Sequence, residues 1–352
     1  EDYILILENG RRLAGEDRYT RINVANIKRI EILNGAASAL YGSDAIGGVI
    51  NIITDDTRNT VNVSSYTHYS GEGRLTESVN ADVNAGKFAS YTSYQRRQAG
   101  SWQNNNIDEN GYETGRPTSV GFYSNTVNQR FVFNATDKLS FYACGTYYDN
   151  KTRRPQDATY YAKSKGQFVQ KDAYTYNLKH ETYTYGAGMK YMINRSAYID
   201  AEFYSDNFSS DYMYFKKSGS YLPGDRVTRK QVRYYNGNIK GIFRLGSRNK
   251  LSAGVEYVNE GLESESDNID SRHMYTLAFY AQDEIKLPLN LQAVLGIRYI
   301  YNENFKNYAT PNVSLMYKLG GLNLRAAYAA GFRTPTLSQL YATDESKTSN
   351  RY

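Results

Sequence analysis

A short polar segment close to the N-terminus carries the residue types best suited to hold a charged ligand. Its candidate ligand-binding residues are Arg12, Glu16, Asp17, Arg18 and Tyr19. A guanidinium group presents a planar fork of donors that suits carboxylate, catecholate or phosphate groups, and the tyrosine ring can stack on a ring system. The two carboxylates would repel an anion unless they pair with the arginines, so a neutral or zwitterionic ligand stays open as well. The alternative is a solvated loop whose charges only keep the segment soluble.

The rest of the sequence offers no residue pattern typical of catalysis or of a metal centre. Its histidines, His68, His180 and His273, lie far from one another and from the single cysteine, Cys144, whereas zinc sites gather such ligands at short spacings. The acidic stretch 256–270 has carboxylates of the kind that calcium prefers, but without the spacing of a calcium loop. We therefore predict neither enzyme activity nor a cofactor or metal site, and bound calcium stays undecided.

The composition restricts the class of protein. The 352 residues include 36 tyrosines, against 13 phenylalanines and one tryptophan. A mean hydropathy of −0.66 and the lack of any apolar run of 18 residues exclude a bundle of transmembrane helices. They do not exclude a membrane β-barrel, whose strands need an apolar side chain only at every second position. The net charge of +6 is spread evenly and no nucleic-acid-binding motif is present, so we predict no nucleic-acid partner.

The chain after residue 59 consists of segments in which apolar and polar residues alternate. Side chains alternate across a strand, so each segment has one apolar and one polar face. Val79, Val83 and Leu295 are among the residues expected to face lipid, whereas Ser78 and Asn80 lie on the polar face. We predict thirteen strands: 60–69, 75–85, 87–97, 122–135, 138–149, 173–192, 197–208, 230–245, 250–261, 273–286, 290–302, 311–318 and 322–332.

The connections between these strands alternate between short turns and long polar stretches. The long stretches are 99–121, 150–172, 209–230, 262–272 and 303–310. This order places every long loop at one end of an up-and-down antiparallel sheet, which is typical of an outer-membrane barrel with short turns at the other end. Tyrosines near strand ends fit the aromatic girdles of such barrels. A soluble β-protein that uses tyrosine for cross-strand pairs is the alternative.

Residues 1–54 differ from the rest and predict a small α/β unit, with a linker at 55–59. The apolar segments 3–7, 27–33 and 49–53 are expected to be strands, and Asn9-Gly10 a tight turn between 7 and 13. A helical turn at 36–41 would end at Gly42, because glycine favours the left-handed cap. Close packing in this unit is assigned to Gly35, Gly42, Gly47 and Gly48.

Two segments resemble a known family. Residues 31–54, EILNGAASALYGSDAIGGVINIIT, resemble the end of the plug domain of TonB-dependent outer-membrane receptors, and residues 328–337, YAAGFRTPTL, resemble a segment of their barrel. The resemblance implies an all-β membrane barrel, antiparallel and up-and-down with about 22 strands when complete, and a small α/β plug in its lumen. Residues 1–54 would then be the C-terminal part of the plug, and 60–352 the N-terminal and middle part of the barrel. The first part of the plug and the last barrel strands are expected to be missing.

The same resemblance implies a function. Such receptors, in the outer membrane of a Gram-negative bacterium, take up a scarce bulky nutrient (a ferric siderophore, haem or cobalamin) with energy from the TonB complex. Outer-membrane lipid is a further expected partner, and a surface lipoprotein stays open as another. The loop 12–20 matches the substrate loop of these receptors in position. The alternative is a passive outer-membrane channel or adhesin without energy coupling, and a soluble sugar-binding β-protein is a distant third. The plug-like segment favours the receptor, because a passive pore does not need it.

Overall fold

The computed structural model describes most of the chain. The described residues are 4–16, 18–34, 41–42, 45–54, 60–100, 121–154, 159–164, 167–172, 175–305 and 307–342. The predicted linker 55–59 and most of the predicted helical turn 36–41 lie outside them. No helix among these residues is both long and apolar enough to cross a membrane.

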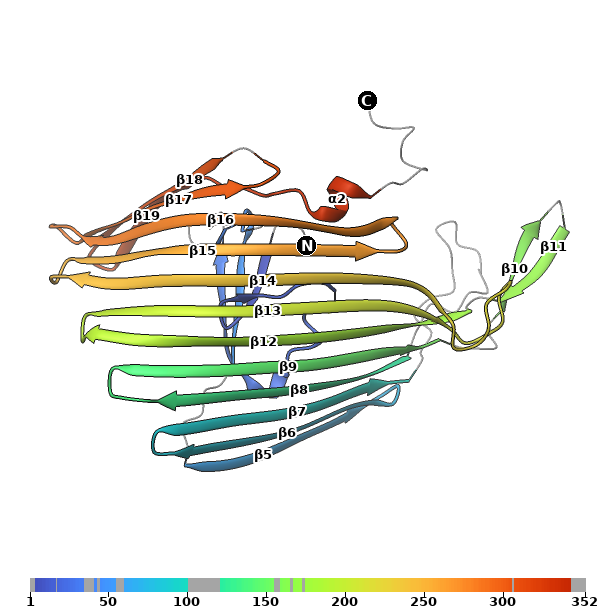
Figure 1. Ribbon diagram of the computed structural model, residues 1–352. Helices are drawn as coiled ribbons and strands as arrows, with labels where there is room; N and C mark the ends of the chain where they lie inside the picture. The colour runs from blue at the N-terminus through green and yellow to red at the C-terminus, as the bar shows by residue number, and fades with distance from the viewer. Residues whose placement is uncertain are drawn as a thin grey trace.

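A thirteen-stranded antiparallel sheet forms most of the molecule, and its strands pair in chain order. Figure 1 shows this sheet curling around the N-terminal residues. The strands are β5 (Val61–Ser70), β6 (Arg74–Ala85), β7 (Phe88–Ala99), β8 (Gly121–Asn134), β9 (Leu139–Arg153), β12 (Tyr176–Asn194), β13 (Ala197–Tyr214), β14 (Arg226–Leu245), β15 (Asn249–Ser264), β16 (Ile269–Lys286), β17 (Leu291–Asn302), β18 (Tyr308–Leu319) and β19 (Leu322–Ala329). These thirteen strands correspond one to one to the predicted ones.

The structure corrects the predicted long loops. Within the predicted loop 150–172, two strands, β10 (Thr159–Ser164) and β11 (Gln167–Asp172), form a separate hairpin, which projects beyond the neighbouring strand ends in Figure 1. About half of the stretch 209–230 belongs to β13 and β14, and most of 262–272 belongs to β15 and β16. The sequence pattern missed these strand ends because both of their faces carry polar side chains, so the alternation that marks a strand disappears.

The two faces of the sheet follow the predicted alternation. On β6, Val79 and Val83 are exposed on the outer face, while Ser78 and Asn80 are buried on the inner face. The buried pair accepts hydrogen bonds from the side chain of Asn23, at 2.8 and 3.4 Å. The polar face of the strand therefore packs against the N-terminal unit, and the apolar face is the outer one.

The N-terminal unit is a four-stranded sheet inside the curve of the large sheet. Its strands are β1 (Ile4–Glu8), β2 (Arg11–Arg12), β3 (Ile27–Asn34) and β4 (Gly48–Thr54), in the order β2-β1-β4-β3, and η1 (Val24–Asn26) is a single 3-10 turn. β1 and β4 are parallel, and the other pairs are antiparallel. Alternate side chains of β1 enter two apolar clusters, with Leu5 and Leu7 in one and Ile6 in the other. Most of β1 is thus buried on both faces, whereas Ile30 and Ile32 of β3 are exposed. The predicted strands and the Asn9-Gly10 turn, with φ of +53° and +83°, are confirmed.

The segment after β19 departs from the predicted strand 322–332. β19 ends at Ala329, and the chain then runs against the plug, where a Cβ added at Gly331 would lie 3.3 Å from Ile46 side-chain atoms. Helix α2 (Leu337–Tyr341) follows, with a capping box at Thr336. Leu337 is buried against Leu262 of β15 and against Ile269 and Met274 of β16. The family-like segment 328–337 therefore includes a crossing over the plug as well as the end of a strand.

Candidate functional site

The loop after β2 lies close to the end of the sheet that carries the longer connections. A carboxylate oxygen of Glu16 is 3.5 Å from Nζ of Lys230 and 3.7 Å from Nε2 of His180. Both partners stand near the long-loop ends of their strands, β14 and β12. The predicted ligand loop therefore lies against the barrel wall at this end of the sheet, and its first carboxylate, Glu16, is next to Lys230 of the wall.

A buried ion pair fixes the base of this loop to the wall. Arg21 donates to both carboxylate oxygens of Asp206 at 2.6 and 3.1 Å, and the two side chains are only 3% and 0% exposed. The same carboxylate accepts from the backbone N–H of Ala14 at 2.8 Å and from the Thr184 hydroxyl at 3.0 Å. These hydrogen bonds replace the ones that the carboxylate would form with water. A buried charge is stable only when it has such partners. Asp206 was not singled out in the sequence, because a lone aspartate on a polar strand face carries no signal of its partner.

Close contact at Gly15 adds a second fixed point. Its φ of +71° is in the left-handed region, and a Cβ at this position would come within 2.3 Å of the Phe208 ring. The Phe208 ring in turn packs on the His180 ring, with centroids 5.1 Å apart. Only glycine combines this backbone conformation with this approach to the wall. No pattern in the sequence indicates this role for Gly15.

The predicted ligand-binding residues do not form one cluster, because each of them has different contacts. Nη2 of Arg12 is 3.8 Å from Glu260, and its guanidinium stacks over the Tyr234 ring at 5.6 Å, so this arginine is directed to the wall. Arg18 curls back to donate to the Gly15 carbonyl at 2.9 Å, and Tyr19 is 50% exposed. Asp17 lies outside the described residues. Tyr19 and the half-exposed Glu16 therefore form the accessible part of the loop, whereas Arg12 and Arg18 are partly buried.

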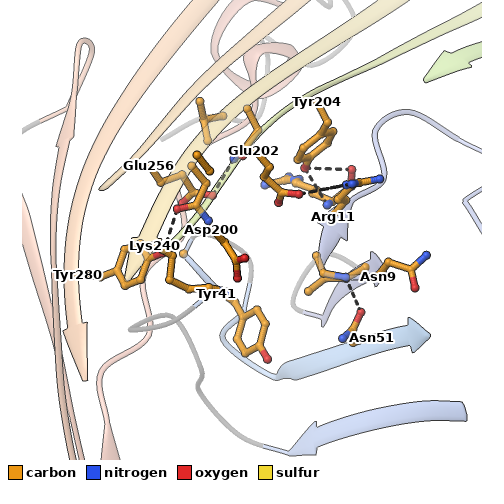
Figure 2. A pocket seen from close by; sticks show the side chains of 18 of the residues that line it. Asn9, Arg11, Tyr41, Asn51, Asp200, Glu202, Tyr204, Lys240, Glu256 and Tyr280 are labelled. Atoms are coloured by element: carbon orange, nitrogen blue, oxygen red, sulfur yellow. Dashed lines mark hydrogen bonds and ion pairs between the residues drawn. The ribbon is translucent and has the colours of Figure 1, made fainter. Parts of the chain in front are cut away.

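A cavity of about 760 Å³ lies between the plug and the barrel wall, beyond the Asn9-Gly10 turn. Figure 2 shows that Arg11 of the plug lies beside Glu202 of the barrel wall. Asp200, Lys240 and Glu256 lie along the same wall. Glu202 accepts from Arg11 at 3.4 Å and from the Tyr142 hydroxyl at 2.5 Å. Asp200 and Glu202 thus line the lumen. Arg298 lines it too, and donates to Glu256.

Arg11 keeps its charge in this enclosed place. Burial lowers the pKa of its guanidinium, but Cys144, Tyr142 and Glu202 raise it by more, and the pKa lies above its usual value. Nη1 also donates to Sγ of Cys144 at 2.9 Å. A permanently charged side chain that contacts two barrel strands holds the β1–β2 hairpin against the wall.

The glycines assigned to plug packing differ in what surrounds them. Gly42 is buried with φ of +80°, and a Cβ there would lie 3.2 Å from the Arg298 guanidinium. Gly48 is buried at the start of β4 with φ of +147°. Gly47 is exposed, so the structure gives it no packing contact of this kind, and Gly35 lies outside the described residues.

The histidines and the acidic stretch do not converge on one centre. Glu256, Glu260 and Glu265 pair with Arg298, Arg12 and Arg226. Within the described ranges, no group of three or more histidine, cysteine, aspartate or glutamate side chains is placed to hold a metal ion.

Family models match both parts of the chain. The model described as TonB dependent receptor-like, beta-barrel, matches residues 101–351, and the TonB-dependent Receptor Plug Domain matches residues 1–49.

Solved structures share the fold. The ferric enterobactin receptor PfeA of Pseudomonas aeruginosa, as a point mutant, aligns with 15% identity and a TM-score of 0.80, over 96% of this chain and 55% of that one. The siderophore receptor PirA of Acinetobacter baumannii aligns with 17% identity and a TM-score of 0.75, over 95% and 54%. The FrpB iron transporter of Neisseria meningitidis aligns with 11% identity and a TM-score of 0.73, over 95% and 58%. The chain spans little more than half the length of these proteins.

With a plug-domain match at its N-terminus, a barrel match over most of the remainder, and a sheet that curls around a small buried plug, the chain belongs to the TonB-dependent receptor family.

Proposed function

We propose that this chain is part of an outer-membrane receptor of a Gram-negative bacterium, which takes up a ferric siderophore with energy from the TonB complex. The observation that carries the proposal is the anchoring of the loop 12–20 at the long-loop end of the barrel wall, through Arg21, Asp206 and Gly15. A loop held in this way presents its side chains to ligands that arrive from outside. Relatives of the same fold are described as siderophore receptors or as an iron transporter, which supports the same class of nutrient.

The charges around the loop favour an anionic iron chelate over neutral cobalamin. Lys230 stands next to Glu16 and offsets its negative charge, while Arg97 donates to the Thr20 carbonyl at 3.2 Å on the far side. Arg18 adds a further guanidinium. Clustered cations at the mouth of a lumen raise the local concentration of anions, and a guanidinium matches catecholate or carboxylate oxygens. Haem, which also carries carboxylates, is the second ligand to test.

The loop residues Arg12, Glu16, Asp17, Arg18 and Tyr19 have unequal roles in this proposal. Tyr19 contacts the chelate, because it is half-exposed, and Arg18 next to it supplies a guanidinium to the same ligand. Arg12 keeps the loop in place through its contacts with Glu260 and Tyr234. Glu16 ties the loop to Lys230.

Binding to the purified full-length receptor tests the ligand. Ferric catecholate, ferric hydroxamate, haem and cobalamin are titrated by calorimetry into the parent protein and into Arg18→Ala/Tyr19→Ala. We expect one ferric siderophore to bind to the parent protein, and the variant to bind the same compound at least tenfold more weakly. Unchanged affinity in the variant would indicate that the ligand binds to the barrel loops instead of the plug loop. If cobalamin were the only compound that bound, the proposal of a siderophore as the ligand would be rejected.

Energy coupling needs a separate test, because a passive channel is the alternative. Uptake of the iron-labelled chelate is compared in cells with and without a functional TonB complex. A receptor of the proposed kind accumulates the chelate only when the complex is present. Equal uptake in both strains would favour a passive channel, and binding without uptake in either would favour an adhesin.

A further inference from the structure

Asn23 of the plug is a buried residue, 2% exposed, whose side-chain amide has a partner for every donor and acceptor. Nδ2 donates to the hydroxyls of Ser78 and Ser93 at 2.8 Å each. Oδ1 accepts from Nε2 of Gln95 at 2.7 Å and from the backbone N–H of Ala25 at 3.0 Å. A primary amide has two donor hydrogens and two acceptor positions. Four directional bonds on one short side chain therefore hold it in a single orientation.

The partners of Asn23 on the barrel wall form a polar socket on two neighbouring strands. Ser78 is on β6, Ser93 and Gln95 are on β7, and each of the three is 1% exposed. Asn26, at the end of the turn η1, donates to the same Ser93 hydroxyl at 2.9 Å. Buried polar groups cost free energy unless they are hydrogen-bonded, so the plug segment and this β6–β7 socket stabilise each other.

The β6–β7 socket is on a different part of the wall from the partner of Arg21. Asp206 is on β13, and the strands β12, β9 and β8 lie between β13 and β7 in the sheet. Because the sheet curls around the plug (Figure 1), the short chain from Arg21 to Asn23 is held from two directions. One anchor would let the segment turn about it, whereas two anchors on separate strands also fix its orientation.

The same part of the wall holds the chain just before Arg21. Arg97, on the strand β7 of the socket, donates to the Thr20 carbonyl at 3.2 Å. Tyr19, the half-exposed residue of the apical loop, directly precedes this contact. The place of Tyr19 in the lumen therefore depends on how the segment 20–23 is seated on β7.

We propose that Asn23 is a positioning residue for the ligand: it binds the β6–β7 socket and thereby sets the orientation of the loop 12–20, without touching the ligand itself. The inference rests on the proposed function, because that function assigns ligand contact to this loop. An amide suits the role, since it supplies donors and acceptors together and brings no charge into the buried socket. Alanine supplies neither, and aspartate lacks the donors.

Hydrogen exchange of the ligand-free, full-length receptor, followed by mass spectrometry, tests the positioning itself. Asn23→Ala is compared with the parent and with Ser78→Ala/Ser93→Ala, which changes only the wall. We expect the segment 14–21 to exchange at least about tenfold faster in both variants, while β4 and the barrel strands keep their protection. The three substitutions together should add little to either variant, because both remove the same contact.

Asn51→Ala is the matched control. Asn51 is also a buried amide of the plug, 7% exposed, but it accepts from the Gly10 backbone N–H at 2.9 Å and donates to Glu31 at 3.1 Å, both within the plug. This variant should leave the exchange of the segment 14–21 as in the parent. The wall variant keeps the test usable if Asn23→Ala does not reach the outer membrane.

Calorimetry with the ferric siderophore measures the consequence for binding. We expect at least about tenfold weaker binding by Asn23→Ala and parent-like binding by Asn51→Ala. Faster exchange of the loop with unchanged siderophore affinity would overturn the positioning role. If no siderophore bound to the parent, the proposed function would fail, whereas the exchange experiment would still show whether Asn23 holds the loop.

Three results of the exchange experiment would also contradict the proposal. Parent-like exchange of the segment 14–21 in either variant would show that the socket does not hold the loop. Equally faster exchange throughout the plug in Asn23→Ala would indicate a general structural role instead of a positioning one. Fully additive effects of the plug and wall substitutions would show that Asn23 and the socket do not act as a unit.

Discussion

Arg21 of the plug and Asp206 of β13 are 185 positions apart in the chain, yet they form a 2.6 Å ion pair that is almost completely buried. Replacing one partner of such a pair leaves an uncompensated charge in a place without water. The pair is therefore the contact on which the position of the apical loop depends most.

Asp206→Ala should release the loop 14–21 from the wall, with a loss of about 3–5 kcal/mol in the stability of plug docking. Hydrogen exchange of this segment, measured by mass spectrometry on the full-length receptor, should become faster while the barrel strands keep their protection. Glu284→Gln is a matched control, because it removes the exposed Lys250–Glu284 pair, worth about 0–1 kcal/mol. Unchanged exchange of the loop in Asp206→Ala would contradict the anchoring role.

Gly15→Ala should displace the loop, since the new methyl group would meet the Phe208 ring and the backbone has a positive φ. We expect weaker binding of the siderophore and partial rescue by Phe208→Ala in the same chain, both measured by calorimetry. Gly10→Ala is the control. Its φ is also positive, but nothing lies within 4 Å of the added Cβ. If Gly10→Ala weakened binding as much as Gly15→Ala did, backbone strain rather than contact would be the cause.

Gly48→Val should perturb the plug and reduce uptake while leaving the barrel inserted, because Gly48 is buried and has φ of +147°, which disfavours a β-branched residue. Uptake of labelled siderophore and the amount of receptor in the outer membrane are measured together. Gly47→Val, at an exposed position, should have a smaller effect. Undiminished transport by Gly48→Val would argue against a packing role for this glycine.

Val79→Arg should destabilise the inserted barrel by about 2–4 kcal/mol, the cost of an arginine near the midplane of the bilayer. Tyr69→Arg, on the same face but at the long-loop end of β5, should cost about 0–1 kcal/mol. Urea titration of the receptor folded into phosphatidylcholine vesicles measures both changes. Equal costs at the two positions would show that the outer face of β6 does not contact hydrocarbon.

Much of the fold was predictable from local patterns. Alternation along a strand depends only on neighbouring residues, so the thirteen strands of the large sheet and the two faces of β6 followed from the sequence. The Asn9-Gly10 turn and the left-handed Gly42 were predictable for the same reason, because each depends on the backbone preferences of one or two residues. The extra hairpin β10–β11 and the crossing after Ala329 were not, because their residues have neither a clear alternation nor an apolar face.

The partners across the lumen were decided by the tertiary structure alone. Nothing near Arg12 in the sequence indicates Glu260, and nothing near Glu16 indicates Lys230. Such pairs depend on the register of the strands and on how the plug is rotated inside the curved sheet. The sequence by itself determined the family, the strands and the residues able to bind a charged ligand. Only the folded chain decided which of them are held by the wall and which remain accessible, because that choice is made by contacts between residues more than a hundred positions apart.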